Sequence, residues 1–306
     1  MANRKANKKR ISFKMLKELQ QRSLHRHYTE IGFRCILLLI NSYFLLVTEN
    51  IIIKVILIFI QAFLFFGFTS MIHESVHNHI PYTSRLVRSI EGRFYQSFLG
   101  LPLNGYKFFH LEHHQKLSTK KDPEYFLRKI QTSRMIKFLA LFLYIFGIHL
   151  FFISLIFSKK IKKEMKSALK GDYVWNVIIW VVVIYLLFNN YTYEALYLYV
   201  LPWFAANPIS YVVHIGRHMN SNPNSKEQQT PIVLTNRITD FLTCNIFYHK
   251  EHHDYASIPW FNLKQVREYE KTQTQTINIS QLLWSWFIEN KQPYTIWSKK
   301  SAQSNS

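Results

Sequence analysis

The apolar residues of the chain gather in long blocks instead of recurring at the spacing of an amphipathic soluble core. Two such blocks, residues 31–47 and 51–72, are separated only by Thr48, Glu49 and Asn50. At about 1.5 Å per helical residue, each block can cross or nearly cross a hydrocarbon core roughly 30 Å thick. The blocks therefore predict a hairpin of two transmembrane helices, whose open ends share the basic, cytoplasmic side.

A second pair of apolar blocks lies at residues 173–188 and 195–213, and the link between them contains no lysine or arginine. This pair predicts a second hairpin that returns to the cytoplasm. The block 135–157 is also long enough to cross, but Arg134 precedes it and a lysine cluster, residues 159–170, follows it. Because a full crossing would leave one basic cluster outside, we predict an interfacial or re-entrant helix there.

We therefore expect an all-α, multi-pass membrane protein with four transmembrane helices in two hairpins and one extra interfacial or re-entrant helix. The expected organisation is a single domain of residues 1–306. Its successive parts are a basic cytoplasmic arm (1–30), the first hairpin (31–72), a segment with two histidine motifs (73–134), the interfacial helix (135–157), the second hairpin (173–213) and a C-terminal cytoplasmic part with a third histidine motif (214–306).

The chain carries a formal net charge of +20, from 38 Lys and Arg against 18 Asp and Glu. Such an excess can indicate nucleic-acid binding, but the basic residues concentrate in the N-terminal arm and beside apolar blocks. This placement is typical of cytoplasmic flanks that contact anionic lipid, so we expect no nucleic-acid partner. Only two cysteines are present, Cys35 and Cys244, and we expect no disulfide framework.

Three histidine motifs are predicted on the cytoplasmic side. His73 and His77 are four residues apart at the end of an apolar block, so on a helix both project from one face. Two further motifs have the form HxxHH, and on a helix the rings of each fall within about 100° of arc. Their residues are His110, His113 and His114 in one, and His249, His252 and His253 in the other. Eight such rings on one side of a membrane predict a metal site.

The number of imidazoles bears on which metal is bound. Zinc usually takes four protein ligands, or three and a water molecule, and eight rings are about twice that number. Eight or more imidazoles imply two ions, and imidazole-rich sites with open positions suit iron that binds and activates dioxygen. His214 and His218 follow the last apolar block and can supply further ligands. We favour His218 as a direct ligand, and His214 as direct or acting through water.

One rival interpretation comes from the first motif, because residues 73–77 spell HESVH, a literal HExxH of zinc metalloproteases. An intramembrane zinc protease would use two histidines and one distant carboxylate. Both HxxHH motifs would then be unexplained. A transporter that uses histidines for metal passage is a further alternative without an enzymatic reaction.

Four carboxylates in or beside the motifs can hydrogen-bond the outer nitrogen of a ligating ring and so fix its tautomer and orientation. They are Glu74, Glu112, Asp122 and Glu251. Asp122 ranks first because the following Pro123 fixes a turn next to the second motif. His79, beside the first motif, is expected to support the ligands rather than to bind metal.

The set HESVH, HLEHH and HKEHH resembles the three histidine boxes of the membrane fatty acid desaturase and hydroxylase superfamily. The flanking sequences GYKFFHLEHHQKLSTKKDPEYF and NIFYHKEHHDYASIPWFNL are similar to its second-box and third-box regions. The resemblance covers roughly residues 73–263 and implies a cytoplasmic centre of two non-haem iron ions. The ligands that it implies are His73, His77, His110, His113, His114, His218, His249, His252 and His253.

The resemblance further implies a reaction in which dioxygen and two electrons remove hydrogen from an unactivated C–H bond of a lipid chain. We expect a fatty acyl desaturase, with a carotenoid ketolase or hydroxylase, or another lipid hydroxylase, as the alternative within the superfamily. The expected substrate is a membrane lipid or a carrier-bound acyl chain. No haem-binding or flavin-binding segment is visible, so we expect a separate electron donor, a ferredoxin or a cytochrome-type protein.

Overall fold

The computed structural model of the chain describes residues 11–79, 84–117, 121–124, 134–159, 161–218, 230, 232–270 and 276–289. Residues 1–10 of the predicted basic arm lie outside these ranges. The chain divides into two compact units. Unit 1 comprises Met1–Arg22, His114–Lys137 and Val213–Ser306, and unit 2 comprises Ser23–His113 and Phe138–Val212.

Five helical segments among the described residues are long and apolar enough to cross a membrane. They are α2 (Leu24–Val47), α3 (Ile51–Val76), α7 (Arg134–Phe157), α8 (Lys163–Phe188) and the continuous run Thr192–Arg217, which contains α9 (Thr192–Ala195), the π-helical turn η1 (Leu196–Val200) and most of α10 (Leu201–His218). The expectation of an all-α, multi-pass membrane protein is confirmed. The division into four crossing helices and one interfacial helix stays a prediction.

The first predicted hairpin is formed by α2 and α3 in unit 2. Its tight link works because the Asn50 side chain accepts hydrogen bonds from the backbone N–H groups of Ile52 and Ile53, which caps the start of α3. Midway along the hairpin, Asn41 Nδ2 donates to Gln61 Oε1 at 2.6 Å. Each amide thus has a partner in a segment where an unsatisfied polar group would be costly.

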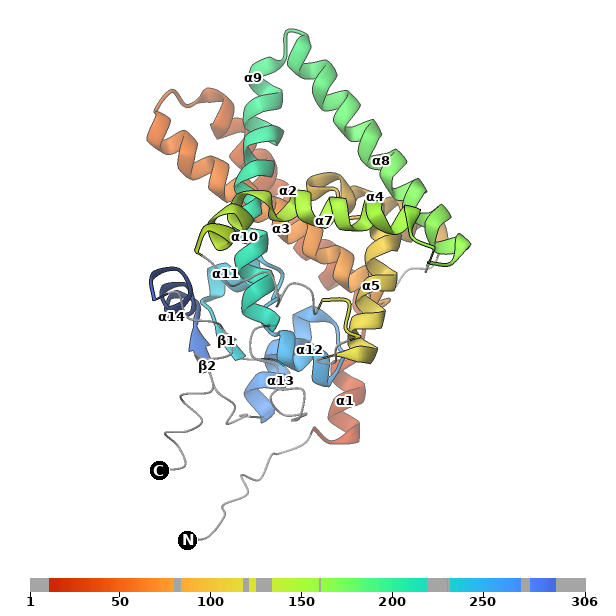
Figure 1. Ribbon diagram of the computed structural model, residues 1–306. Coiled ribbons are helices and arrows are strands. Elements are labelled where there is room, and N and C mark those ends of the chain that lie inside the picture. The colour runs from red at the N-terminus through yellow and green to blue at the C-terminus, as the bar shows by residue number, and fades with distance from the viewer. Residues whose placement is uncertain are drawn as a thin grey trace. The chain divides into compact units, whose positions relative to one another are not determined.

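The second predicted hairpin is formed by α8 and the run from α9 into α10, as Figure 1 shows. Here the helix extends beyond the apolar block from which it was predicted. α8 begins at Lys163, so the end of the lysine cluster is helical. The helix includes these polar residues because its backbone hydrogen bonds do not require apolar side chains, and lysine is a good helix former.

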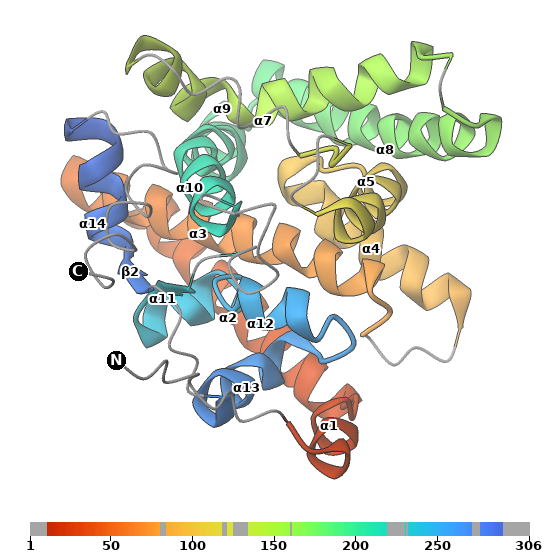
Figure 2. The ribbon, with the colours of Figure 1, turned by 60° about the horizontal axis from the view of Figure 1, so that its bottom comes forward.

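The part of α7 that belongs to unit 2 lies across the direction of α10 in both Figure 1 and Figure 2. Asn207 of α10 accepts a hydrogen bond at 2.9 Å from the backbone N–H of Ile145 in α7. The interfacial or re-entrant placement of this block stays a prediction.

Two helices, α4 and α5, follow the first histidine motif in unit 2. The amphipathic helix α4 (Arg85–Leu99) packs on α3, where the ring of Phe98 stacks on Phe68 with centroids 4.4 Å apart. It ends at Gly100, whose φ of 75° is a left-handed conformation suited to glycine. Helix α5 (Leu103–Lys116) follows and carries the second motif.

Unit 1 is built from short elements. They are α1 (Phe13–Leu19), β1 (Ile232–Leu234), α11 (Arg237–Leu242), α12 (His249–Asp254), η3 (Trp260–Asn262), α13 (Leu263–Glu270), β2 (Thr276–Asn278), α14 (Ile279–Leu283) and the π-helical turn η4 (Trp284–Ile288). The strands form a parallel pair in which Val233 is opposite Ile277. The sequence analysis did not anticipate this pair. Cys35 and Cys244 are both free.

Candidate metal centre

The first histidine motif lies where α3 ends. His73 occupies the last turn, and His77 is the C-cap, whose N–H donates to the His73 carbonyl at 3.4 Å. The next residue, Asn78, has a φ of 55°, a left-handed conformation that asparagine tolerates and that stops the helix. The four-residue spacing thus keeps both rings at the same helix end, with their centroids 5.0 Å apart.

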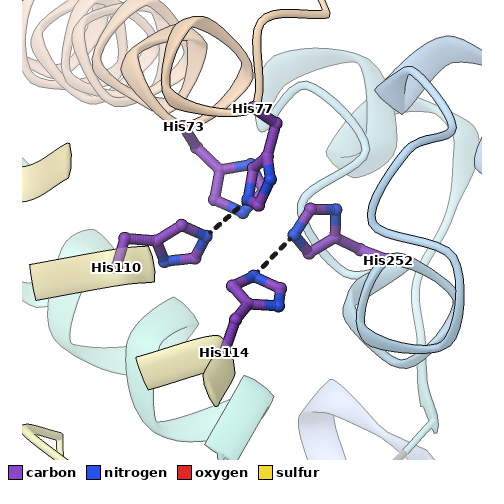
Figure 3. A group of neighbouring side chains, drawn as sticks. All are labelled: His73, His77, His110, His114 and His252. Carbon is purple, nitrogen blue, oxygen red and sulfur yellow. Dashed lines mark hydrogen bonds between the residues drawn. The ribbon is translucent and has the colours of Figure 1, made fainter. Parts of the chain in front are cut away.

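In unit 2, His110 of α5 joins this pair. The ligand nitrogen atoms of His73, His77 and His110 lie within 4.8 Å of one another, and this arrangement can hold a metal ion. Figure 3 shows the three rings turned toward one another, with a dashed line between the Nε2 atoms of His77 and His110, which are 2.8 Å apart. His113 lies one turn beyond His110, and their ring centroids are 6.0 Å apart.

These spacings fit a transition-metal site. Two imidazole nitrogens bound to one ion at about 2.1 Å, in directions at right angles, lie roughly 3 Å from each other. The 2.8 Å between His77 and His110 is close to that value. A set of neutral imidazoles is also the donor set that zinc, copper, iron and nickel accept. The residues present therefore fit a bound first-row metal.

A carboxylate orients the histidines of the first motif. The Glu74 side chain is 4 % exposed, and it pairs with His73 Nδ1 at 2.9 Å and with His79 Nδ1 at 2.6 Å. With its Nδ1 directed at the carboxylate, His73 presents Nε2 as a ligand atom. A protease of the HExxH type needs this glutamate as a general base toward water. Its engagement by two rings argues against the protease interpretation.

The second half of the histidine set lies in unit 1. His114 Nε2 and His252 Nε2 are 3.0 Å apart, and Figure 3 draws this contact as its other dashed line. His249 Nε2 and His253 Nε2 are 2.9 Å apart. The HxxHH spacing on α12 therefore gives a pair of rings at i and i+4, and leaves His252 beside His114.

Helix α12 has only six residues, and α13 holds it in place. The Arg267 guanidinium donates to both carboxylate oxygens of Glu251, at 2.8 and 2.9 Å, and to the carbonyl of Phe247 at 3.0 Å. The same guanidinium lies 4.0 Å from the ring centroid of Tyr248. Glu251, which was predicted to hydrogen-bond a ligating ring, instead forms a two-pronged ion pair with Arg267 within unit 1.

Tyr248, the residue before α12, links it to α11. Its hydroxyl donates to Asp240 Oδ2 at 3.1 Å. Burial raises the pKa of the Tyr248 phenol, and the Asp240 carboxylate raises it further. The phenol therefore stays protonated and keeps donating across the neutral pH range.

The other predicted site residues are His214, His218, Asp122 and Glu112. His214 Nε2 lies 3.6 Å from Glu124 Oε2 in unit 1. Asp122 is buried and accepts a hydrogen bond from the Glu124 backbone N–H at 2.8 Å, which forms the turn expected around Pro123. Glu112 is exposed on α5. His218 is the last residue of α10, and its side chain lies outside the described part of the chain.

Three residues that support the histidines were missed by the sequence analysis. Tyr106 lies one turn before His110, with its hydroxyl 3.4 Å from His110 Nδ1. Arg267 is distant in sequence from the box that it clamps. Glu124 follows the Asp122–Pro123 pair directly, so the acidic pair around this proline was the available signal.

Unit 2 also contains a cavity of about 430 Å³ between α2, α3, α4, α8 and η1. Its walls are almost entirely apolar, and Phe65, Phe98 and Leu198 are among the lining residues. Phe65 precedes His73 by eight residues on α3, which is roughly 12 Å along a helix axis. The cavity thus offers apolar space in the same unit as the first histidine motif.

Comparison with known proteins finds a family whose model covers all three histidine motifs. The family model described as fatty acid desaturase matches residues 50–281, a range that contains all three motifs. A search of curated proteins found no match. The match covers more than half of the sequence, and the chain belongs to the fatty acid desaturase family.

Proposed function

We propose that the protein is a membrane-bound acyl-lipid desaturase with a centre of two non-haem iron ions. The observation that carries the proposal is the family match across all three boxes, together with imidazoles spaced as metal ligands in each unit. Family membership implies an oxidoreductase. The proposed ligands are His73, His77, His110, His113, His114, His249, His252 and His253, with His218 and His214 as further candidates.

The proposed reaction converts a saturated –CH₂–CH₂– unit into a –CH=CH– unit. Two hydrogen atoms leave the chain, and one dioxygen molecule takes them up, together with two electrons and two protons, to give two water molecules. The iron ions supply the activation of dioxygen that an unactivated C–H bond requires. A methylene has no charge to bind, so placement of the reacting carbon depends on apolar walls.

The residues of the chain have distinct tasks in this proposal. The histidines hold the ions, Glu74 fixes the ring of His73, and Arg267 holds the third box through Glu251. The apolar cavity of unit 2 would accept part of a hydrocarbon chain. The substrate is therefore a membrane lipid or a carrier-bound acyl chain.

The proposed active site faces the cytoplasm, because the basic segments flank the ends of the helices that carry the boxes. Electrons come from a separate ferredoxin or cytochrome-type protein. The excess of positive charge suits a negatively charged donor of this kind.

Mass-spectrometric lipid profiling of a host that expresses the protein tests this function. The matched control is the double variant His110→Ala, His113→Ala, which keeps the spans but loses ligands of the second box. We expect acyl chains lighter by two hydrogens that disappear in the variant. Chains that gain an oxygen instead would reassign the protein to the hydroxylases, and oxygenated carotenoids in a carotenoid-producing host would reassign it to the ketolases or hydroxylases.

A substitution in the cavity tests where the chain lies. Ala195 is buried in the cavity wall, and Ala195→Leu adds three carbon atoms there. We expect the products to shift toward shorter acyl chains. Val181→Leu, on an exposed position of α8 outside the cavity lining, is the control and should leave the chain-length profile unchanged.

A further inference from the structure

One acidic side chain of unit 2 is buried far from the histidine motifs in sequence. Asp172 of α8 is fully buried, although a buried carboxylate is costly unless it is paired and hydrogen-bonded. Its one ion-pair partner among the described residues is Arg93 of α4, at 2.8 Å from Oδ1. The other hydrogen bonds that its carboxylate accepts all come from the start of α5.

The carboxylate of Asp172 caps α5 from a different helix. Its Oδ2 accepts the backbone N–H groups of Asn104 and Gly105, at 2.8 and 3.1 Å, and its Oδ1 accepts the Asn104 side-chain amide at 2.9 Å. These are the second and third residues of α5, whose N–H groups a capping side chain normally takes. A negative charge there also complements the helix dipole.

The residue at the N-cap of α5 cannot supply this cap. Pro102 stands at the capping position, since its carbonyl accepts the N–H of Tyr106 at 2.7 Å, and a proline side chain has no hydrogen-bond acceptor. Helices α5 and α8 lie near each other at this point, as Figures 1 and 2 show. A Cβ atom on Gly105 would lie 2.2 Å from Leu169 Cδ2, so a side chain at this position would require the Leu169 side chain to move.

The capped end leads directly to the second histidine box. Tyr106 follows Gly105, and its hydroxyl reaches His110 Nδ1 one turn later. His110 is five residues beyond Gly105, roughly 7.5 Å along the axis, within a single rigid helix. A shift or rotation at the start of α5 therefore moves the rings of His110 and His113.

We propose that Asp172 is a positioning residue that fixes the register of α5 and thereby the second histidine box. The proposal rests on the proposed metal-binding function. We therefore expect loss of the Asp172 carboxylate to change metal binding while the protein still folds.

The test compares Asp172→Ala with Asn176→Ala in the purified, full-length protein. Asn176 lies one turn further along α8 and is also buried, but its amide contacts Gln96 and the Gly100 carbonyl of the α4 end, not α5. Each protein is titrated with Co²⁺, and the visible spectrum, the affinity and the melting temperature are recorded. Asp172→Asn, which keeps one acceptor oxygen, is the conservative variant.

We expect Asp172→Ala to weaken Co²⁺ binding at least about tenfold and to alter the spectrum, as loss of supporting groups around metal ligands does. Asp172→Asn should recover part of both, and Asn176→Ala should keep the wild-type spectrum even where its melting temperature falls. A wild-type spectrum and affinity in Asp172→Ala, or an equal change in Asn176→Ala, would overturn the proposal.

Two further outcomes separate this proposal from the proposed function. A wild-type protein that binds no Co²⁺ overturns both, whereas one that binds Co²⁺ but leaves host lipids unchanged overturns only the desaturase reaction. If Asp172→Ala is not recovered folded, Asp172→Asn and Asn104→Ala carry the test. If both variants gave the wild-type Co²⁺ spectrum, Asp172 would not position the second histidine box.

Discussion

The histidines of unit 2 and those of unit 1 are positioned in different ways. In unit 2, His73, His77 and His110 project from α3 and α5, and their closest support, Glu74, is a neighbour in sequence. In unit 1, His249, His252 and His253 stand on a six-residue helix that would not form in isolation. The first arrangement depends on helix periodicity, and the second depends on a contact between residues distant in sequence.

This difference predicts where the site is most easily disrupted. A ligand on a long helix is displaced less when a contact beside its ring is lost, because the helix is held along its length; only a contact that sets the position of the whole helix, such as that of Asp172 to α5, has a larger effect. A ligand on α12 depends on Arg267, whose guanidinium accounts for both oxygens of Glu251. We therefore expect substitutions that support the third box to have larger effects than comparable substitutions near the first.

The largest effect is expected for Arg267→Met, which leaves the Glu251 carboxylate buried without its cation. Breaking a buried ion pair from one side costs roughly 3–5 kcal/mol, and Arg267 is partly exposed, which favours the lower end. We expect a fall in melting temperature and loss of metal binding, measured by Co²⁺ titration. Lys264→Met is the control, because Lys264 forms only an exposed pair with Glu268 on the same helix. If both variants lost metal binding and stability to the same extent, the third box would not depend on Arg267 in the way proposed.

A smaller effect is expected for Glu74→Gln in unit 2. The amide can no longer accept from both His73 and His79, and loss of such a supporting carboxylate lowers metal affinity by about 10–100-fold. The helix end itself should remain folded. Ser75→Ala removes a neighbouring hydroxyl that donates, among the described residues, only to the Met71 carbonyl, and this variant should bind metal normally. Unchanged affinity in Glu74→Gln would contradict the role given to the carboxylate.

A third, still smaller effect concerns Tyr248→Phe. This variant loses the hydrogen bond to Asp240 but keeps the ring on which Arg267 lies. One such bond contributes about 1 kcal/mol, so we expect a lower melting temperature and a decrease in metal affinity of roughly fivefold. An effect as large as that of Arg267→Met would mean that the phenol, not the ion pair, holds α12.

The smallest effect is expected for Tyr106→Phe, the counterpart in unit 2. Its hydroxyl lies 3.4 Å from His110 Nδ1, a long hydrogen bond, and the tyrosine ring stacks on the imidazole with or without the hydroxyl. We expect metal affinity within about twofold of wild type, below the effect of one ordinary hydrogen bond. A larger loss than in Tyr248→Phe would reverse the comparison between the units.

The sequence predicted the features that depend on local patterns. Two tightly linked pairs of apolar blocks predicted both hairpins, and the four-residue spacing of His73 and His77 predicted a shared helix end. The helix bounds were less well predicted where polar residues continue a helix. α2 begins at Leu24, where Ser23 caps it, although the apolar block begins only at residue 31.

Features that depend on distant contacts could not be predicted in this way. Arg267 and Asp172 carry no signal that connects them with Glu251 or Asn104, because each pair meets only after folding. The parallel pairing of β1 and β2 is similar, since strands of three residues, more than forty positions apart, leave no periodic pattern. Such contacts support the histidines and become visible only in the fold, whereas the spacing of the histidines indicates a metal site from the sequence alone.

The iron content of the purified protein tests the central claim most directly. We predict two iron ions per chain in the wild type, and a lower content in both His110→Ala and His252→Ala, which each remove one proposed ligand, the first from unit 2 and the second from unit 1. A single zinc ion per chain, or an iron content that neither substitution lowers, would contradict the assignment of the three boxes to a di-iron centre.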